Sequence, residues 1–158
     1  MSIVKVREYL SKWERGEDIL EFDTSSATVE LAANALGVEA GRIAKTLSFK
    51  MGEGAMLIVA AGDARIDNGK FKQEFGFKAK MLSPEEVLEF TGSAIGGVCP
   101  FGVEQSVTIY LDESMKRFGT VFPACGSSNS AIELTCAELE EYSLARSWVD
   151  VCKDYNTF

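Results

Sequence analysis

The sequence predicts a single α+β domain built on a mixed sheet. Its length of 158 residues is typical of one domain. Helical patterns are dispersed among strand-like apolar segments along the chain. Several strand-like segments are joined by turns too short for a parallel crossover, which argues against a doubly wound parallel sheet. We find no repeat, linker or low-complexity stretch, so residues 1–158 are expected to form one domain.

Five segments are expected to be helical, because apolar residues recur every three or four positions or a capping residue precedes them. Ser26 or Thr28 can cap the second helix, and Ser83 begins a capping box for the fourth. Glycines should end several of them, Gly16 after the first and Gly37 after the second. The expected helices cover residues 2–15, 28–36, 67–75, 83–91 and 136–145, with one more helical turn at 39–44.

The expected strands share alternating or continuous apolar patterns. Residues 55–61 are apolar throughout, which predicts a central strand buried on both faces. The turn at 52–54 should join it to the strand before it, and the turn at 126–129 should join the last two strands. The expected strands cover residues 19–22, 45–49, 55–61, 77–81, 106–111, 120–122 and 131–134.

Composition excludes several classes of function. The chain has no histidine, which removes histidine bases, Ser–His and Cys–His pairs and HExxH zinc sites. Its four cysteines form no CxxC motif and are expected to be free thiols. The net charge of −8 argues against broad nucleic-acid binding such as DNA binding, although a local patch could still bind one end of a nucleic acid. We expect no metal and no cofactor.

The chain shows no sign of a membrane protein or a secreted one. The longest apolar run, residues 55–61, is too short to span a bilayer. The N-terminal residues lack the apolar region and cleavage site of a signal peptide. We therefore expect a cytoplasmic protein with no membrane partner.

Two stretches could carry chemistry. The loop Gly96–Gly102 holds three glycines and Pro100, so it is either a tight packed connection or a loop whose amides face a ligand. Lys45 enters a strand between apolar residues, so it is either solvated or placed in a cleft, where it could hold a phosphate or stabilise an oxyanion. Cys99 could act as a thiol nucleophile, but no histidine can activate it, and loop filling is favoured.

Charged residues elsewhere have plainer interpretations. Asp63, Asp67 and Asp112 are not spaced as metal ligands and are expected in turns and caps. The densest group of basic residues is either a solvated face or, in an acidic protein, the best place for a polyanion to bind. It comprises Lys70, Lys72, Lys78 and Lys80.

The order of these motifs resembles the YbaK / prolyl-tRNA synthetase-associated editing-domain family, over residues 3–152. The resemblance implies that family's fold, a mostly antiparallel, barrel-like mixed sheet surrounded by helices. The residues that carry it are Ala32-Ala33, Leu36-Gly37-Val38, Ile43-Ala44-Lys45-Thr46-Leu47, Gly62-Asp63, Arg65-Ile66-Asp67, Leu82-Ser83-Pro84-Glu85-Glu86-Val87, Thr91-Gly92, Gly96-Gly97-Val98-Cys99-Pro100-Phe101-Gly102, Asp112, Gly126 and Ile132-Glu133-Leu134.

The resemblance implies hydrolysis of the ester in mischarged aminoacyl-tRNA, by a freestanding trans-editing deacylase that binds the tRNA 3′ end. The family's lysine falls on Lys45 and is expected to hold the terminal phosphate or ribose. The amides of Gly96 and Gly97 would hold the aminoacyl carbonyl, while the substrate's ribose hydroxyl helps to activate water. Residues expected to shape the substrate site are Thr28, Val98, Cys99, Pro100, Gly102, Ala124 and Gly126.

The resemblance leaves the amino acid and the partners open. The branch that clears cysteinyl-tRNA carries a tyrosine before its first hydroxyl-rich turn and a serine two residues before the later glycine. Here Phe22 lies near the first position and Ala124 occupies the second. Cysteine is therefore less favoured, and alanine, serine or threonine are equally plausible. An aminoacyl-tRNA synthetase is a further partner to consider, the protein is expected as a monomer or weak homodimer, and the alternative function is a non-catalytic tRNA- or synthetase-binding module.

Overall fold

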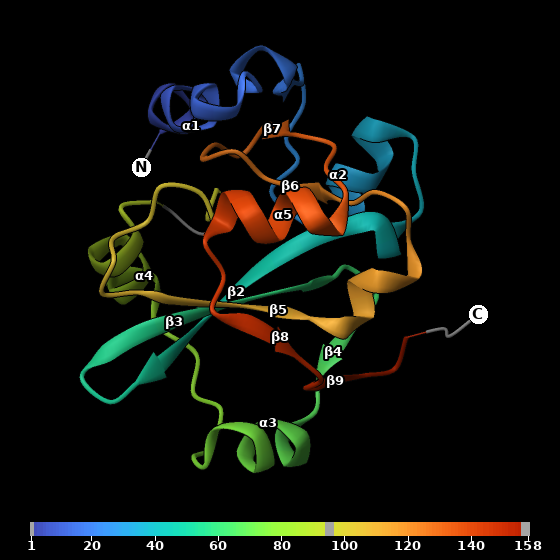
Figure 1. Ribbon diagram of the computed structural model, residues 1–158. Helices are drawn as coiled ribbons and strands as arrows, with labels where there is room; N and C mark the ends of the chain where they lie inside the picture. The colour runs from blue at the N-terminus through green and yellow to red at the C-terminus, as the bar shows by residue number, and fades with distance from the viewer. Residues whose placement is uncertain (1, 94–96, 156–158) are drawn as a thin grey trace.

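The computed structural model describes residues 2–93 and 97–155 (Figure 1). Its helices are α1 (Ile3–Leu10), α2 (Val29–Leu36), α3 (Asn68–Phe75), α4 (Pro84–Thr91) and α5 (Cys136–Ser143). Short 3₁₀ turns lie at η1 (Ser11–Trp13), η2 (Gly16–Asp18), η3 (Ala40–Arg42) and η4 (Glu113–Arg117). The strands are β1 (Leu20–Glu21), β2 (Ile43–Met51), β3 (Gly54–Ala61), β4 (Arg65–Ile66), β5 (Thr108–Asp112), β6 (Phe122–Pro123), β7 (Ser130–Ala131), β8 (Ser147–Val149) and β9 (Cys152–Lys153).

A five-stranded mixed sheet in the order β6-β2-β3-β5-β8 forms the centre of the molecule. Its longest pairing is the antiparallel hairpin β2–β3, in which Thr46 lies opposite Val59. The pairings β2–β6, β3–β5 and β5–β8 are parallel. The predicted α+β class with a mixed sheet is confirmed, and the central sheet contains more parallel pairing than we expected. The two further pairs, β1–β7 and β4–β9, are antiparallel.

β3 is buried on both faces, as its continuous apolar sequence predicts. Every residue from Ala55 to Ala61 is at most 1% exposed. Helix α5 lies across the sheet, whereas α3 lies at the opposite end of the molecule from α1 (Figure 1). One large core cluster extends from α1 through β3 and β5 to α5, and a smaller one joins α2 to β6. The smaller cluster lies beside the edge of β2 that carries the candidate site.

Most predicted helix signals are confirmed. The side chains of Thr28, Asp67, Ser83 and Thr135 cap helices α2 to α5 in order, and those of Ser83 and Thr135 lie in complete capping boxes. Gly37 ends α2 with a φ of 69°. Gly16 does not stop the first helix, because Glu14 adopts the left-handed conformation there with a φ of 60°.

The expected strand at 77–81 does not form. Only Met81 makes an isolated bridge, to Phe49. The segment nevertheless runs along the edge of β2, since the Lys50 amide donates to the Lys80 carbonyl at 2.8 Å and the Leu82 amide donates to the Ser48 carbonyl at 3.1 Å. The last two expected strands are also shorter than predicted, and β6 and β7 pair with β2 and β1 respectively.

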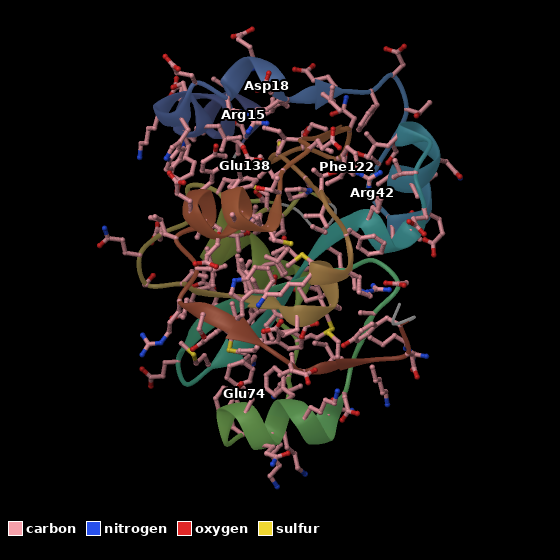
Figure 2. The ribbon with its side chains drawn as sticks, turned by 45° about the vertical axis from the view of Figure 1, so that its right-hand side comes forward. Arg15, Asp18, Arg42, Glu74, Phe122 and Glu138 are labelled. Atoms are coloured by element: carbon pink, nitrogen blue, oxygen red, sulfur yellow. The ribbon has the colours of Figure 1, made fainter. Side chains whose placement is uncertain are left out.

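The N-terminal segment is held to the body by Arg15. Its guanidinium donates to Asp18 at 2.6 Å and to the carboxylate of Glu138 on α5. Figure 2 shows Arg15 between these two acidic side chains. Among the residues described, no helix is long and apolar enough to cross a membrane.

Candidate functional site

The candidate site is a gap in the pairing of strand β2. On its inner side β2 pairs with β3 from Ala44 to Met51. On its outer side β6 pairs only with Ile43 and Ala44, and the chain at Lys80–Leu82 first bonds at Ser48. The outer edge at Thr46 is therefore left without a neighbouring strand.

A cavity of about 320 Å³ opens at this gap. Apolar side chains from α2, β2, β6 and the start of α4 form most of its wall, and five hydroxyl residues complete it. Lys45 is the sole ionisable residue among the described residues that line it. The lining residues are Ser26, Ala27, Thr28, Val29, Ala32, Ile43, Ala44, Lys45, Thr46, Leu47, Ser48, Met81, Leu82, Val87, Val98, Phe122, Ala124, Ser130 and Ala131.

The ammonium group of Lys45 is held by backbone carbonyls of the turn after β3. It donates to the carbonyl of Ala64, and to that of Gly62 at 3.3 Å. Burial lowers the pKa of Lys45 from its ordinary value, since desolvation disfavours the charged form. The nearby Asp63 carboxylate acts in the opposite direction. The turn thus fixes the position of the ammonium group of Lys45, a residue that lines the cavity.

An ion pair anchors that turn. Arg117 donates from Nη1 to Oδ2 of Asp63 at 2.9 Å and from Nη2 to Oδ1 at 2.5 Å. The Arg117 side chain is 8% exposed, so the pair is largely shielded from water. Arg117 holds the pKa of Asp63 below its usual value. Two nearly parallel hydrogen bonds restrict the orientation of the carboxylate, which stabilises the turn that binds Lys45.

Thr46 presents backbone groups toward the gap. Ser48 and Lys50 bond outward to the segment at 80–82, and residues two apart in a strand point the same way. The N–H and C=O of Thr46 therefore point outward as well. Its Oγ1 is inaccessible to solvent and has no hydrogen-bond partner among the described residues. An unpartnered buried hydroxyl is costly, so its position beside a cavity is notable.

Three of the other hydroxyls of the wall already have partners. Thr28 Oγ1 accepts the amide of Leu31 at 3.2 Å as the helix cap. Ser26 Oγ donates to the carbonyl of Ser128 at 3.3 Å. Ser130 Oγ lies 2.6 Å from Ser127 Oγ. These contacts shape the wall and tie residues 25–28 to the turn at 126–129.

The part of the wall that β6 forms is apolar, and the Arg42 side chain covers its aromatic ring. Phe122 lines the cavity, and the Arg42 guanidinium carbon lies 5.1 Å from its ring centroid. Figure 2 shows Arg42 beside Phe122. Arg42 is in turn bonded to the carbonyl of Thr120 at 3.2 Å. Phe122 is therefore held in place beside Ala124, which also lines the cavity.

The residues of the predicted glycine loop lie in several different environments. Gly96 lies outside the described residues. Gly97 is packed against the 126–127 turn, where an added Cβ would lie 3.4 Å from the Ser127 backbone. Val98 lines the cavity, whereas Pro100 is buried and outside its lining. Gly102 lies beside a second cavity of about 220 Å³ and next to the Tyr9 ring.

Gly126 supports the cavity wall from behind. Its φ is +89°, and a Cβ there would lie 2.9 Å from Cγ2 of Val6 and 3.0 Å from the Ser2 backbone. Only glycine meets both conditions without strain. Gly126 does not line the cavity itself, but two residues before it Ala124 does.

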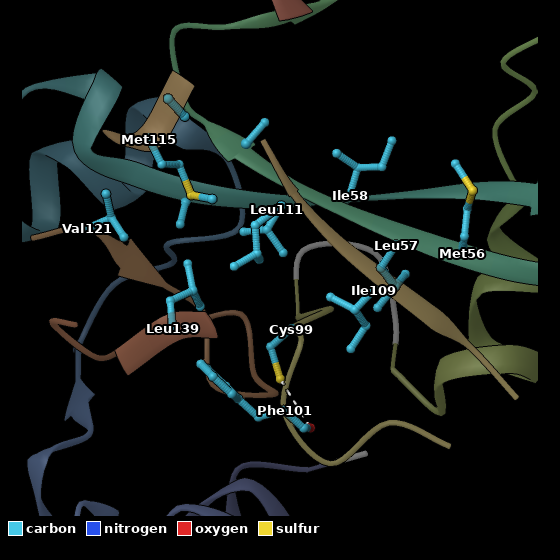
Figure 3. Packing of buried hydrophobic residues seen from close by; sticks show 14 of the residues in the cluster. Met56, Leu57, Ile58, Cys99, Phe101, Ile109, Leu111, Met115, Val121 and Leu139 are labelled. Atoms are coloured by element: carbon cyan, nitrogen blue, oxygen red, sulfur yellow. Dashed lines mark hydrogen bonds between the residues drawn. The ribbon is translucent and has the colours of Figure 1, made fainter. Parts of the chain in front are cut away.

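Cys99 lies in the hydrophobic core. It is 0% exposed, and its thiol donates to the Phe101 carbonyl at 3.9 Å. Figure 3 shows it among Leu139, Leu111 and Ile109. Burial raises the pKa of the Cys99 thiol to about 12, so it is protonated at neutral pH. The structure favours loop filling over the thiol-nucleophile hypothesis.

The structure thus brings together Thr28, Lys45, Val98 and Ala124 of the predicted residues. Cys99, Pro100, Gly102 and Gly126 lie outside the cavity lining, and so does Gly97. Sequence reasoning missed the contribution of Thr46, the strand residue next to Lys45. It also missed Met81 and Leu82, whose segment was expected as an ordinary strand. Within the described ranges, no cluster of three or more acidic or sulfur side chains could hold a metal ion.

Comparison with known proteins identifies the class. Residues 23–142 match the model of the aminoacyl-tRNA editing domain. The chain belongs to this family, and the resemblance inferred from its motifs is confirmed.

The similar proteins include freestanding chains and parts of synthetases. The uncharacterized protein YwhH of Bacillus subtilis is 62% identical over 157 residues, covering 98% of this chain and 99% of its own. EbsC of Enterococcus faecalis, described as a candidate Cys-tRNA(Pro)/Cys-tRNA(Cys) deacylase, is 30% identical and covers 83% of this chain and 76% of EbsC. The proline–tRNA ligase of Thermotoga maritima is 29% identical over 114 residues, which make up 20% of that enzyme.

A solved structure agrees with the fold. A crystal structure described as a candidate trans-editing enzyme for prolyl-tRNA synthetase superposes with a TM-score of 0.85 at 34% identity. The match covers 96% of each chain. The predicted fold type is therefore confirmed over nearly the whole chain.

Proposed function

We propose that this protein hydrolyses the ester between a small amino acid and the 3′-terminal adenosine of mischarged tRNA, acting in trans. The observation that carries the proposal is the composition of the cavity wall: an apolar pocket with Lys45 as its sole described ionisable residue. Such a wall suits a small, uncharged side chain, because it offers no carboxylate to a cationic side chain, and its one described cation, Lys45, is assigned to the phosphate or ribose of the substrate. Membership of the editing family supplies the ester as the bond to be broken.

Water is the nucleophile in this proposal. It attacks the ester carbonyl carbon, the acyl C–O bond breaks, and the tRNA leaves with a restored 3′-terminal ribose hydroxyl. The Lys45 amino group donates to two backbone carbonyls rather than presenting a base to the cavity, and the described lining includes no carboxylate or imidazole. The neighbouring ribose hydroxyl of the substrate therefore orients and activates the water. The protein contributes positioning and fixed hydrogen-bond donors.

Named residues take distinct roles. The Lys45 ammonium binds the terminal phosphate or ribose hydroxyls as a point charge. The outward N–H of Thr46 at the strand edge is a donor for the aminoacyl carbonyl, a role that the resemblance gives to the amides of Gly96 and Gly97. Ala124 and Val98 bound the space for the side chain of the amino acid.

A panel of mischarged tRNAs tests the proposal. Wild-type protein should release at least one small amino acid, among alanine, serine, threonine and cysteine, faster than buffer does. Lys45→Ala should lower that rate at least 10-fold. Lys50→Ala is the matched control, because Lys50 lies on the same strand but pairs with Glu86 at 3.2 Å. A substrate ending in 2′-deoxyadenosine should also be poorly hydrolysed if the vicinal hydroxyl activates water.

The same panel of mischarged tRNAs distinguishes the deacylase from the alternative function, a non-catalytic binding module. Binding of charged tRNA or of a synthetase without ester hydrolysis on any member of the panel would overturn the deacylase proposal. Equal rates for wild type and Lys45→Ala would remove Lys45 from the mechanism.

A further inference from the structure

We propose that Lys72, Lys78 and Lys80 form a docking track for the phosphate backbone of the RNA helix whose 3′ end enters the cavity. This inference rests on the proposed function, because that function supplies the 3′ end. The inference goes beyond the proposed function, because it assigns the surface that binds the RNA and the direction from which the RNA approaches.

The track begins at the rim of the cavity. Met81 and Leu82 line the cavity, and Met81 is 59% exposed. The preceding residues are tied to the edge of β2 through the Lys80 carbonyl, which accepts the Lys50 amide at 2.8 Å. Lys78 and Lys80 are both exposed, and Ala79 between them is half-buried. Even a fully extended chain advances only roughly 3.3 Å per residue, so Lys78 lies within about 10 Å of Met81.

The track continues to α3. Exposed Lys72 and Lys78 share the wall of a hollow of about 390 Å³, together with Asn68, Gly69 and Ala79. The same segment of chain therefore joins this hollow to the catalytic cavity. A strand leaving the cavity at Met81 meets Lys80, then Lys78, then Lys72.

Within residues 2–93 and 97–155, these three ammonium groups form no ion pair. Among the described residues, the lysine ion pairs are those of Lys50, Lys70 and Lys116. The nearest acidic side chain on α3 is Glu74, two positions from Lys72, and residues two apart on a helix do not face each other. Glu86 on α4 is occupied by Lys50 and by the Ser83 amide.

Charge on the α2 and α4 sides of the cavity opposes RNA. From residue 16 to residue 41 the chain contains no lysine or arginine, and α2 in this stretch forms one cavity wall. The carboxylates of this stretch are all exposed; Asp18 and Glu21 pair with Arg15 and Arg7, whereas Glu17, Asp23, Glu30 and Glu39 form no ion pair with another described residue. Helix α4 presents exposed Glu85 and Glu89. A polyanion is therefore repelled on the α2 and α4 sides and attracted on the 72–80 side.

The first experiment measures binding, so it does not depend on hydrolysis. A fluorescent RNA hairpin with a single-stranded 3′ end is titrated with wild type, Lys72→Glu and the double variant Lys78→Glu/Lys80→Glu. The double variant should weaken binding at least 10-fold. The neutral double variant Lys78→Gln/Lys80→Gln should reduce the slope of log Kd against log salt by about 2, close to one per lysine.

A matched control uses two exposed lysines at the far end of the molecule. Lys5→Glu/Lys12→Glu on and after α1 makes the same change in net charge, and should leave hairpin affinity within about 2-fold of wild type. Thermal melting checks that every variant is folded. Equal weakening by Lys78→Glu/Lys80→Glu and by Lys5→Glu/Lys12→Glu would show an effect of net charge and would overturn the track. Unchanged affinity in Lys78→Glu/Lys80→Glu would overturn it as well.

A second experiment separates the track from the chemistry. On mischarged tRNA the Lys78→Glu/Lys80→Glu variant should raise KM at least 10-fold with little change in kcat. On 3′-aminoacyl-adenosine, which has no phosphates, it should match wild type. Loss on both substrates would overturn the track. Lysine-dependent hairpin binding without hydrolysis of any ester would instead leave the track standing and remove the proposed deacylase function.

Discussion

Arg117 holds Asp63 through both terminal nitrogens, at 2.9 Å and 2.5 Å. Asp63 lies between Gly62 and Ala64, whose carbonyls accept hydrogen bonds from Lys45. Arg117, at the end of η4, thereby helps to position the ammonium group of a residue that lines the cavity. The position of the Lys45 side chain therefore depends on the Arg117–Asp63 ion pair as well as on strand β2.

Asp63→Asn should destabilise the protein in a pH-dependent way. The Asp63 side chain is 29% exposed, so we expect a loss of about 1–3 kcal/mol at pH 7, below that of a fully buried pair. Arg117 lowers the pKa of Asp63, so this stabilisation is complete above the ordinary value of about 3.9 and is lost as pH falls through the lower folded value. Denaturant unfolding of both proteins at several pH values measures it.

The difference in stability between the two proteins should therefore begin to shrink as pH falls below about 4, and should vanish once Asp63 is protonated in the folded protein. Glu113→Gln is a suitable control, because its exposed pair with Lys116 should contribute no more than about 1 kcal/mol. A difference between wild type and Asp63→Asn that persists unchanged at pH 3 would contradict the assignment.

Thr46→Val should separate stability from activity. The hydroxyl has no partner among the described residues, so its replacement by a methyl group should leave the free energy of unfolding unchanged or raise it. Deacylation should fall about 10-fold if that hydroxyl hydrogen-bonds the substrate, a loss of about 1.4 kcal/mol. Paired melting curves and initial rates give both quantities.

Thr108→Val on β5, which is not part of the cavity lining, provides the comparison. A marked loss of stability in Thr46→Val would mean that its hydroxyl has a partner in the folded protein. An unchanged rate would place it outside the reaction.

Ala124→Leu should close part of the cavity. Ala124 lies beside Phe122, which Arg42 holds in place, so the added side chain has to occupy the space for the amino acid. We expect deacylation of every substrate in the panel to fall at least 10-fold while the protein remains folded. Ala124→Ser, which adds one oxygen, should keep most of the activity and change the preference among small amino acids. Wild-type rates in the leucine variant would place the substrate elsewhere.

Cys99→Ala should lower stability and spare catalysis. The thiol is 0% exposed in the core, and its removal leaves a small cavity that should cost about 1 kcal/mol. Since burial raises the pKa of this thiol to about 12, it supplies no nucleophile at neutral pH. The variant should deacylate at the wild-type rate, and insensitivity of wild type to thiol alkylation would agree. A variant that is folded but inactive would revive the thiol-hydrolase hypothesis.

Local signals in the sequence were sufficient for most elements. Thr28, Asp67 and Ser83 are capping residues whose function depends on a few neighbouring positions, and the structure confirms all three. Continuous apolar sequence identified β3 as a buried central strand. Signals of this kind act within one turn or one strand, so they can be read without the fold. The exception at Gly16 arose because Glu14 ended the helix earlier.

Pairing between distant segments was harder to predict. The segment at 77–81 alternates like a strand, but it bonds to β2 at only a few positions and leaves Thr46 uncovered. The extent of its pairing with β2 depends on where α3 ends and α4 begins in the folded protein. The alternation of apolar and polar residues in the segment does not encode those positions. The site therefore gained Thr46, Met81 and Leu82 from the tertiary structure alone.

The sequence by itself determined the class of fold, the family and the absence of histidine chemistry, and it predicted Lys45 as a residue of the site. These follow from composition, capping and ordered motifs, which are properties of residues and their neighbours. Only the tertiary structure decided which groups meet: Lys45 on the Gly62–Ala64 turn, Val98 rather than Cys99 at the cavity, and an open edge at Thr46. The physical reason is that contacts, burial and unpaired strand edges arise between segments far apart in the chain.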